Sequence, residues 1–417
     1  MTTSITTQTR SSQARPLDLE PMPELTPQNS DMLAMGLLVI QPSPFCNINC
    51  DYCYLPNRTD TRRMDHDVLR TVMEKIWSSG LVGSPFSLLW HAGEPLAVPI
   101  SWYEKAFEII NSFPDAEDFV IHSIQTNGTL INDKWCDFLN KHQVEVGLSI
   151  DGPQEIHDHH RKTRKGEGTW GKAIRGMECL KRNNVSFGVI SVISDVSVDH
   201  PDEIYEFYRE NGITGVGFNI EEVEGANETS SLEKVGGDER VRSFLQRFYE
   251  RNKADGFPVN VREFQNAERN ILEPGWSSMP DGNYYNQEAD PFGMVNVDCF
   301  GNFSSFSPEL LGQPTEKYGS FNFGNLLGGT VFDATRNESF QQVLADIEAG
   351  NQKCAKTCKF YQHCGGASPS NKYYENGTFD STETHQCRST VQMPMEIVLA
   401  DFEERLGING AFMRPAD

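Results

Sequence analysis

The sequence lacks the features of a membrane or secreted protein. No apolar run approaches the roughly 20 residues that a helix needs to cross a bilayer. Residues 1–30 have no apolar core of the kind found in signal peptides. They are instead rich in Ser, Thr, Gln and Pro, which predicts a disordered N-terminal tail. We therefore expect a cytoplasmic protein that makes no contact with a membrane.

Basic residues are also scarce. The chain has 36 Lys and Arg against 59 Asp and Glu, a formal net charge of −23, and no Lys/Arg-rich run. Such a chain repels a phosphate backbone, so nucleic acid is not expected as a partner, and a cationic or neutral peptide suits this surface better. With 417 residues, 38% of them hydrophobic, the chain can still bury the cores of two or three domains.

Disulfides are not expected, although the chain has ten cysteines. No secretion signal accompanies these cysteines, and most of them are clustered: three lie between residues 46 and 53 and four between 354 and 387. In a reducing compartment, clustered cysteines are more often metal ligands than disulfide partners. Cys136 and Cys179 lie outside the clusters, in helical patterns, and are interpreted as packed core thiols.

Six short apolar runs alternate with amphipathic stretches. The runs do not alternate in polarity, which is typical of strands that are covered on both faces. The predicted strands are Met35–Ile40, Phe86–Trp90, Phe119–Ile124, Val144–Ile150, Phe187–Ile193 and Gly215–Ile220. Helices are predicted near 66–79, 101–112, 132–142, 170–183, 201–211 and 237–254. This βα repeat predicts an α/β fold with a parallel sheet, either an open doubly wound sheet or a partial barrel.

The segments whose residues are suited to catalysis or ligand binding follow the ends of these strands. Residues 46–53 follow the first strand, 93–95 the second and 127–128 the third, and residues 149–152 end the fourth. Parallel folds bind ligands at the carboxyl ends of their strands, where these loops gather. The placement therefore predicts a catalytic site at that end of the sheet.

Beyond residue 257 the pattern changes. Residues 274–330 are rich in Gly, Pro, Asn, Ser and Phe and show little periodicity, and residues 350–390 contain the second cysteine cluster. We interpret the latter as a small, loop-rich domain that a metal stabilises. The predicted divisions are a tail over 1–34, a barrel over 35–257, a bridging region over 258–345, the small domain over 346–392 and a C-terminal helix and tail over 393–417.

Cys46, Cys50 and Cys53 supply three thiolates from one loop. A [4Fe–4S] cluster normally takes four cysteines, so three of them leave one iron open to another ligand. Zinc is the alternative, but a structural zinc site usually has four protein ligands. His91 could complete such a set, although it lies beyond the second strand.

The Cys-x3-Cys-x2-Cys spacing, with Tyr52 before the last cysteine, resembles the signature of the radical S-adenosylmethionine (SAM) superfamily. The resemblance implies a partial (β/α)6 TIM-like barrel in which SAM chelates the open iron. It also implies that an electron from the cluster cleaves SAM to a 5′-deoxyadenosyl radical, which abstracts a hydrogen from the substrate. An external electron donor such as flavodoxin or ferredoxin is then expected as a partner.

Other segments resemble the family's SAM-binding segments. Residues 92–96 look like its GGEP segment, with Ala92 in place of the first glycine, and 125–128 and 149–153 resemble polar strand ends near the ribose. The arginine of His157-Asp158-x2-Arg161 is expected to meet the SAM carboxylate, unless this is a solvated basic loop. Tyr52 is expected on the adenine side, with core packing as the alternative. The residues that the resemblance assigns to SAM are Tyr52, Gly93, Glu94, Pro95, Thr126, Asn127, Ser149 and Arg161.

The second cluster provides four thiolates, enough for one closed [4Fe–4S] or zinc site. Its ligands would be Cys354, Cys358, Cys364 and Cys387. Their spacing resembles the SPASM domain of peptide-modifying radical SAM enzymes, which typically holds two auxiliary clusters. Here Phe306 and Ser368 stand where further cysteines are expected, and Cys299 is interpreted as a packed thiol. The resemblance therefore implies a reduced SPASM domain with one auxiliary cluster, and two [4Fe–4S] clusters in the chain.

Residues 306–312 and 365–372 resemble the Grr-type maturases, which are associated with glycine-rich repeat peptides and form cyclophanes. The resemblance implies a maturase that takes a β-hydrogen from a ribosomally synthesised precursor peptide and joins that carbon to an aromatic ring. The auxiliary cluster would then accept an electron or serve only as a structural staple.

Glu309 and Asp151 are the candidate catalytic residues, since each is a carboxylate near a predicted strand end or domain junction that could accept the ring proton. Glu221, Glu222 and Asp298 share this placement. Three alternative functions stay open. They are an anaerobic sulfatase-maturating type of enzyme, a thioether-forming enzyme and a non-catalytic, zinc-stapled peptide-binding module.

Overall fold

The computed structural model describes residues 34–232, 237–273, 275 and 284–408. Nearly all of the predicted N-terminal tail, and the tail after residue 408, therefore lie outside the described residues. Among the residues described, no helix has the length and apolar character of a membrane span.

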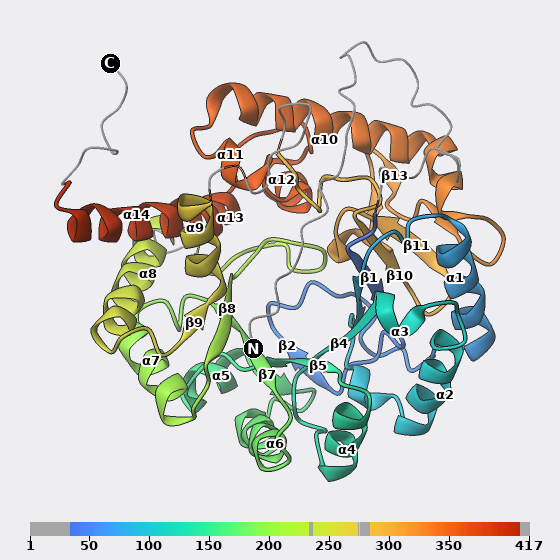
Figure 1. The fold of residues 1–417 in the computed structure, drawn as a ribbon, viewed down its shortest axis with the longest axis horizontal. Helices are drawn as coiled ribbons and strands as arrows, with labels where there is room; N and C mark the ends of the chain where they lie inside the picture. The colour runs from blue at the N-terminus through green and yellow to red at the C-terminus, as the bar shows by residue number, and fades with distance from the viewer. Residues whose placement is uncertain (1–33, 233–236, 274, 276–283, 409–417) are drawn as a thin grey trace.

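A curved parallel sheet forms the centre of the molecule. Its six central strands run parallel in the order β1, β3, β4, β5, β7, β8, which confirms the predicted βα repeat. They span Leu37–Ile40, Phe86–Trp90, Val120–Thr126, Glu145–Ser149, Phe187–Ile193 and Gly215–Ile220. The strands curve into an open ring with helices on its outer side, as expected for a partial barrel (Figure 1).

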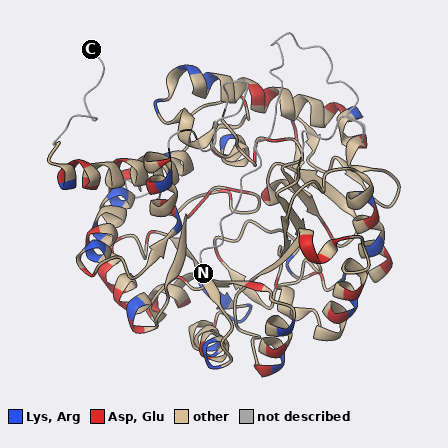
Figure 2. Cartoon of the chain, in the orientation of Figure 1, with Lys and Arg blue, Asp and Glu red and all other residues tan. Residues whose placement is uncertain are grey.

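The outer helices begin and end where the sequence provides caps. The Asp65 side chain accepts a hydrogen bond from the Asp67 backbone at the start of α1, and Gly80 follows its end with a positive φ of 79°. The Asn132 side chain caps α4 in the same way. The helices that cover the six central strands are α1 (His66–Ser78), α2 (Ile100–Ile110), α4 (Asp133–Lys141), α6 (Trp170–Arg182), α7 (Pro201–Glu210) and α8 (Gly237–Ala254). Acidic and basic residues are interspersed on these helices (Figure 2).

The region after residue 257 extends the sheet, which the sequence analysis did not predict. β10 (Met294–Val297) pairs in parallel with β1, so that Leu37 lies opposite Met294. β11 (Asn302–Ser305) and β14 (Gly324–Asn325) continue this edge antiparallel, and β9 (Asn260–Val261) pairs with β8 at the other edge. β10 is only four residues long, but all four are buried. Its strand conformation is thus explained by the neighbouring β1 and not by a local pattern.

The second cysteine cluster lies in a group of helices that Figure 1 shows at the open side of the ring. The long helix α10 (Glu338–Thr357) is followed by α11 (Tyr361–Cys364), α12 (Pro369–Asn376) and α13 (His385–Cys387). The last helix, α14 (Met393–Leu406), packs on α8 and on α9 (Arg262–Leu272). The C-terminal segment is therefore joined to the barrel by packed helices.

Candidate active site and auxiliary cysteine site

The first cysteine cluster lies on the loop after β1. Within this loop, β2 (Ile48–Cys50) pairs antiparallel with β6 (Arg161–Thr163), which places Cys50 opposite Arg161. Two arginines hold the loop backbone: Arg58 Nη1 donates to the Cys50 carbonyl at 2.9 Å, and Arg164 Nη2 donates to the Cys46 carbonyl at 2.9 Å. The three thiols are therefore presented by a constrained turn.

The three thiols lie in a largely enclosed site. Cys50 is buried, and Cys46 and Cys53 are half-buried. Burial raises the pKa of Cys46 and of Cys50 to about 12, so that neither ionises near neutral pH without a positive partner. An iron cluster supplies that positive charge and binds the thiolate form. Three thiols on one loop, with the Arg161 guanidinium near Cys50, fit a three-cysteine [4Fe–4S] site.

Glu94 joins the second and third strand ends. Its buried carboxylate accepts hydrogen bonds from Leu96 N at 2.9 Å, Thr126 Oγ1 at 2.7 Å and Asn127 N at 2.9 Å. Burial raises the pKa of Glu94 to about 7. Gly93 precedes it with a φ of +138°, and a Cβ there would lie 2.3 Å from the Ser43 carbonyl oxygen. Glycine is therefore required at this position by both conformation and space.

Asn127 carries this network to the cysteine loop. Its Nδ2 donates to Asn47 Oδ1 at 2.9 Å and lies 3.9 Å from Cys46 Sγ. At the next strand end, Ser149 Oγ accepts a hydrogen bond from Gln125 Nε2 at 2.9 Å. The structure thus gathers the predicted SAM-binding segments at the carboxyl ends of the strands, beside Cys46. Their individual contacts with SAM stay predictions.

Asp151 and Arg161 form a buried ion pair. Arg161 donates from Nε at 2.8 Å and from Nη2 at 3.0 Å to the Asp151 carboxylate, which also accepts hydrogen bonds from the Tyr52 hydroxyl and from Val192 N. Burial alone would raise the pKa of Asp151, but the charge and hydrogen bonds of Arg161 hold it below its ordinary value. The solvated-loop interpretation of Arg161 is therefore wrong. Asp151 is an anchor in this structure, and its role as a proton acceptor stays a prediction.

Glu309 belongs to a group of carboxylates that come from distant parts of the chain. Burial, reinforced by the charges of Glu222 and Glu288, raises the pKa of Glu309 to about 7. The pKa of Glu224 is raised well above its ordinary value by burial and by the charges of Glu309 and Glu222. We call Glu222, Glu224, Glu288 and Glu309 the carboxylate group. A pKa of about 7, as for Glu309, is suited to proton exchange near neutral pH.

Tyr54 lies between the carboxylate group and the cysteine loop. Burial and the charges of Glu309, Cys53 and Glu224 raise its pKa well above the ordinary value, so all three acidic groups lie nearby. Its hydroxyl is 3.2 Å from His91 Nε2, and burial lowers the pKa of His91 to about 4. His91 is therefore a neutral partner of Tyr54.

The remaining candidate carboxylates hold loops. Glu221 accepts a hydrogen bond from Ser231 N at 3.1 Å, and Asp298 accepts hydrogen bonds from Phe300 N and Asn302 N at 2.8 and 2.9 Å. Sequence reasoning named Glu222 and Glu309 but missed Glu224 and Glu288. The only signal for Glu224 was its place just after β8, and Glu288 lies in a segment without periodicity.

The four cysteines of the second cluster line one cavity of about 410 Å³. Cys354 and Cys358 lie at the end of α10, Cys364 ends α11, and Cys387 ends α13. These four thiols fit a closed four-cysteine cluster, because they face a common space from three helices. Other residues at the cavity wall include Lys359, Phe360, Tyr361, Glu383 and Gln392.

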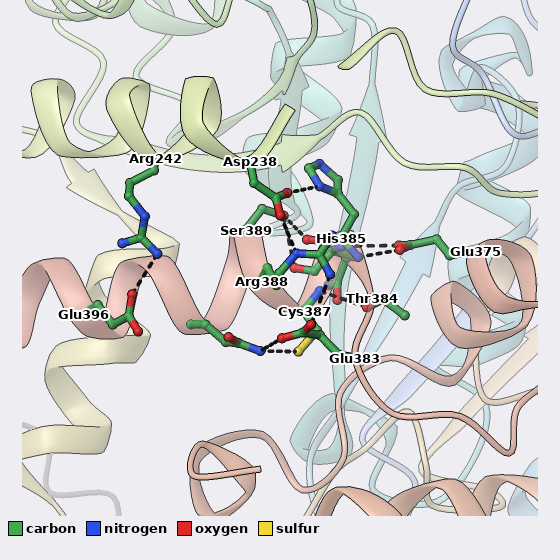
Figure 3. Close-up of polar contacts among 12 residues, drawn as sticks. Asp238, Arg242, Glu375, Glu383, Thr384, His385, Cys387, Arg388, Ser389 and Glu396 are labelled. Atoms are coloured by element: carbon green, nitrogen blue, oxygen red, sulfur yellow. Dashed lines mark hydrogen bonds and ion pairs between the residues drawn. The ribbon is translucent and has the colours of Figure 1, made fainter. Parts of the chain in front are cut away.

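The segment that carries Cys387 is tied to the barrel through Asp238 at the start of α8 (Figure 3). The Asp238 carboxylate is 2.7 Å from His385 Nδ1 and accepts a hydrogen bond from Arg388 Nε. The Thr384 side chain accepts a hydrogen bond from Cys387 N at 3.0 Å. Polar contacts on both sides of Cys387 therefore fix this thiol in place.

The positions of the expected but absent cysteines are filled by packing and hydrogen bonds. Phe306 is fully buried and stacks on Phe340 with ring centroids 5.7 Å apart. Ser368 Oγ lies 3.0 Å from Ser370 Oγ. Cys136, Cys179 and Cys299 are all buried, in agreement with their interpretation as packed thiols.

Three thiols on the first βα loop of a partial barrel, beside polar strand ends, define an iron–sulfur enzyme of the TIM-like class. Residues 40–224 match the model of the radical SAM superfamily. The chain is 42% identical over 377 residues to the uncharacterized protein sll1766 of Synechocystis sp., covering 89% of this chain and 93% of that protein. It is 30% identical over 351 residues to a cysteine-type anaerobic sulfatase-maturating enzyme of Clostridium perfringens, covering 80% and 89%.

The fold is shared with a solved structure of anSMEcpe with bound AdoMet. The TM-score is 0.72 at 22% identity, with 89% of this chain and 95% of that chain covered. From the family match and the relatives together, the chain belongs to the radical SAM superfamily. Membership of this superfamily implies SAM and one [4Fe–4S] cluster as its cofactors.

Proposed function

We propose that this radical SAM enzyme matures a ribosomally synthesised peptide by forming a cyclophane, a bond between a side-chain β-carbon and an aromatic ring carbon. The observation that carries the proposal is the carboxylate group with raised pKa values, which lies near Cys53 through Tyr54. When bound, SAM and its cluster supply the 5′-deoxyadenosyl radical that takes the β-hydrogen. Cys46, Cys50 and Cys53 hold that cluster.

The remaining chemistry requires one proton and one electron to leave the aromatic ring after the new bond has formed. Glu309 is the proposed proton acceptor, because its carboxyl has a pKa of about 7 and accepts a hydrogen bond from Ser307 Oγ. Glu222 and Glu288 raise that pKa and so favour proton uptake. The electron leaves by way of an auxiliary cluster held at the second cysteine site. In total the peptide loses two hydrogens.

The second cysteine site is proposed to hold a [4Fe–4S] cluster and not zinc. Its four thiols line a cavity of about 410 Å³, and four cysteines are the usual ligand set of a [4Fe–4S] cluster. The chain would then carry two clusters, with flavodoxin or ferredoxin as the electron donor.

A peptide substrate is supported by the relative from Clostridium perfringens, whose name describes the maturation of a sulfatase, which is a protein. That relative also supports a second candidate function, the oxidation of a Cys or Ser side chain in a protein. The 30% identity over 351 residues favours it. Phe306 and Ser368 favour crosslinking, because they remove the further auxiliary ligands expected of a complete SPASM domain.

The test is anaerobic incubation of the enzyme with SAM, a reductant and a candidate precursor peptide that contains aromatic residues. We expect release of 5′-deoxyadenosine and a peptide that has lost two hydrogens, with fragmentation blocked between the joined residues. Oxidation of a peptide Cys with loss of its sulfur would support the second candidate. SAM cleavage with an unchanged mass for every aromatic precursor tried would contradict crosslinking.

Glu309→Gln is expected to lower the rate of crosslinking by about 10²–10⁴-fold, the usual contribution of a general base. Release of 5′-deoxyadenosine should persist, because hydrogen abstraction precedes loss of the ring proton. In the wild type, crosslinking should rise as the pH rises through about 7, since only the ionised carboxylate accepts a proton. Product formation as a function of pH, measured by mass spectrometry, checks both effects.

The matched control is Glu316→Gln, which alters an exposed glutamate of the same region and should change neither the rate nor the pH profile. An unchanged crosslinking rate in Glu309→Gln would remove Glu309 from the mechanism.

A further inference from the structure

Lys372 is a buried lysine beside the auxiliary cysteine site. It lies in α12, is 1% exposed, and its Nζ donates a hydrogen bond to Asn351 Oδ1 at 3.2 Å. The thiols of Cys354, Cys364 and Cys387 lie close enough to Lys372 for their charges to act on it. Lys372 therefore lies beside the four-cysteine site.

A buried ammonium is costly unless a negative group compensates it. Among the ion pairs of the described residues, none joins Lys372 to a carboxylate. The negative groups beside it are the cysteines of the auxiliary site, which are thiolates when a cluster is bound. The placement of Lys372 is thus explained by a charged cluster and not by a conventional salt bridge.

The chain is built to hold Lys372 in this position. Gly366 has a φ of +110°, and a Cβ there would lie 2.1 Å from Asn351 Oδ1. Glycine therefore lets Asn351 approach from α10 and hold the ammonium. This accounts for two residues of the segment 365–372 that the proposed catalytic chemistry leaves without a role.

We propose that Lys372 raises the reduction potential of the auxiliary cluster, an inference that depends on the proposed two-cluster function. Reduction adds one negative charge to a cluster that already carries four thiolates. A buried cation beside the thiolates stabilises the reduced state, because net charge around a cluster is an established determinant of its potential. Lys372 thereby makes the cluster a better electron acceptor. It acts through the cluster and is a positioning residue, not a catalytic one.

Lys359 provides a matched comparison. It lines the same cavity, but its side chain is 72% exposed and lies 3.5 Å from Glu396. Solvent and the neighbouring carboxylate screen its charge from the cluster. Substitution of Lys359 should therefore leave the potential of the cluster unchanged.

The test is a potentiometric titration of the anaerobically reconstituted full chain, followed by electron paramagnetic resonance. The cluster whose spectrum does not change on addition of SAM is the auxiliary one. In Lys372→Met, the ratio of reduced to oxidised auxiliary cluster at a fixed potential should fall at least tenfold, a shift of about 59 mV for one electron. In Lys372→Arg and Lys359→Met the auxiliary cluster should have the reduction potential of the wild type. The potential of the first cluster should not change in any variant.

The iron content of each sample separates the possible failures. If Lys372→Met holds about eight irons per chain and titrates with the wild type, the inference is wrong and the two-cluster function stands. If the wild type holds about four irons, or zinc at the second site, the inference about Lys372 and the two-cluster function are both wrong. If Lys372→Met does not retain its cluster, Lys372→Gln is titrated in its place with the same expected shift.

Discussion

Replacing Cys46, Cys50 and Cys53 together with Ala is expected to abolish the release of 5′-deoxyadenosine from SAM. These thiols are the only cysteines of the loop after β1 and the proposed ligands of the first cluster, and without that cluster no open iron can chelate SAM. The loop backbone is held by Arg58 and Arg164, so loss of the thiols should leave the turn in place. The measurement is chromatography of the products after anaerobic incubation with SAM and dithionite.

The control for this experiment is Cys299→Ala. Cys299 is also a buried thiol, 2% exposed, but it lies outside both clusters. We expect this variant to release 5′-deoxyadenosine at the wild-type rate. Turnover that survives in the triple variant would refute the assignment of the first cluster, because no other group of cysteines lies on that loop.

Asp151→Ala is expected to lower the free energy of unfolding by about 3–5 kcal/mol, the usual cost of removing one partner of a buried ion pair. The substitution leaves the buried Arg161 guanidinium without its carboxylate and also removes the acceptor of the Tyr52 and Val192 hydrogen bonds. Because these groups border the cysteine loop, SAM cleavage should fall as well. Denaturant unfolding of the anaerobically purified protein measures the first effect.

The matched control is Asp133→Ala. Asp133 and Arg182 are 2.7 Å apart, but their side chains are 67% and 59% exposed, so the loss in stability should be much smaller than in Asp151→Ala. A loss in Asp151→Ala no larger than in this control would contradict the buried-pair account.

The dependence of stability on pH provides a second test of the ion pair between Asp151 and Arg161. The pKa of Asp151 is lowered in the folded protein, so the unfolded state binds its proton first as the pH falls. The stability that Asp151 contributes is therefore fully present above its ordinary pKa of 3.8 and is lost as the pH falls through the folded value. The difference in stability between wild type and Asp151→Ala should shrink over that range.

The parallel strands and outer helices could be predicted from the sequence because their signals are local. Each strand is a short apolar run, and helices such as α1 carry caps and a buried stripe. β10 could not be predicted in this way. It is four residues long in a segment rich in Gly and Pro, and its conformation depends on pairing with β1, about 250 residues away in the chain.

The residues of the candidate site that belong to sequence motifs could be predicted. The residues that come together only in the folded chain were missed. The cysteine spacings predicted two groups of thiols, and the structure places three of them on one loop and four at one cavity. Glu224 and Glu288 have no motif, and their pKa values are raised by burial that only the folded chain produces, which the charges of Glu309 and Glu222 reinforce at Glu224. Arg161 shows the reverse case, because its basic neighbours suggested a solvated loop while the structure buries it against Asp151.

The most direct test of the account is the iron and sulfide content of the full chain after anaerobic purification and reconstitution. A radical SAM enzyme with one auxiliary cluster should hold about eight irons and eight sulfides per chain. About four irons with an empty second site, or zinc bound by the four C-terminal cysteines, would contradict the two-cluster enzyme proposed for this chain.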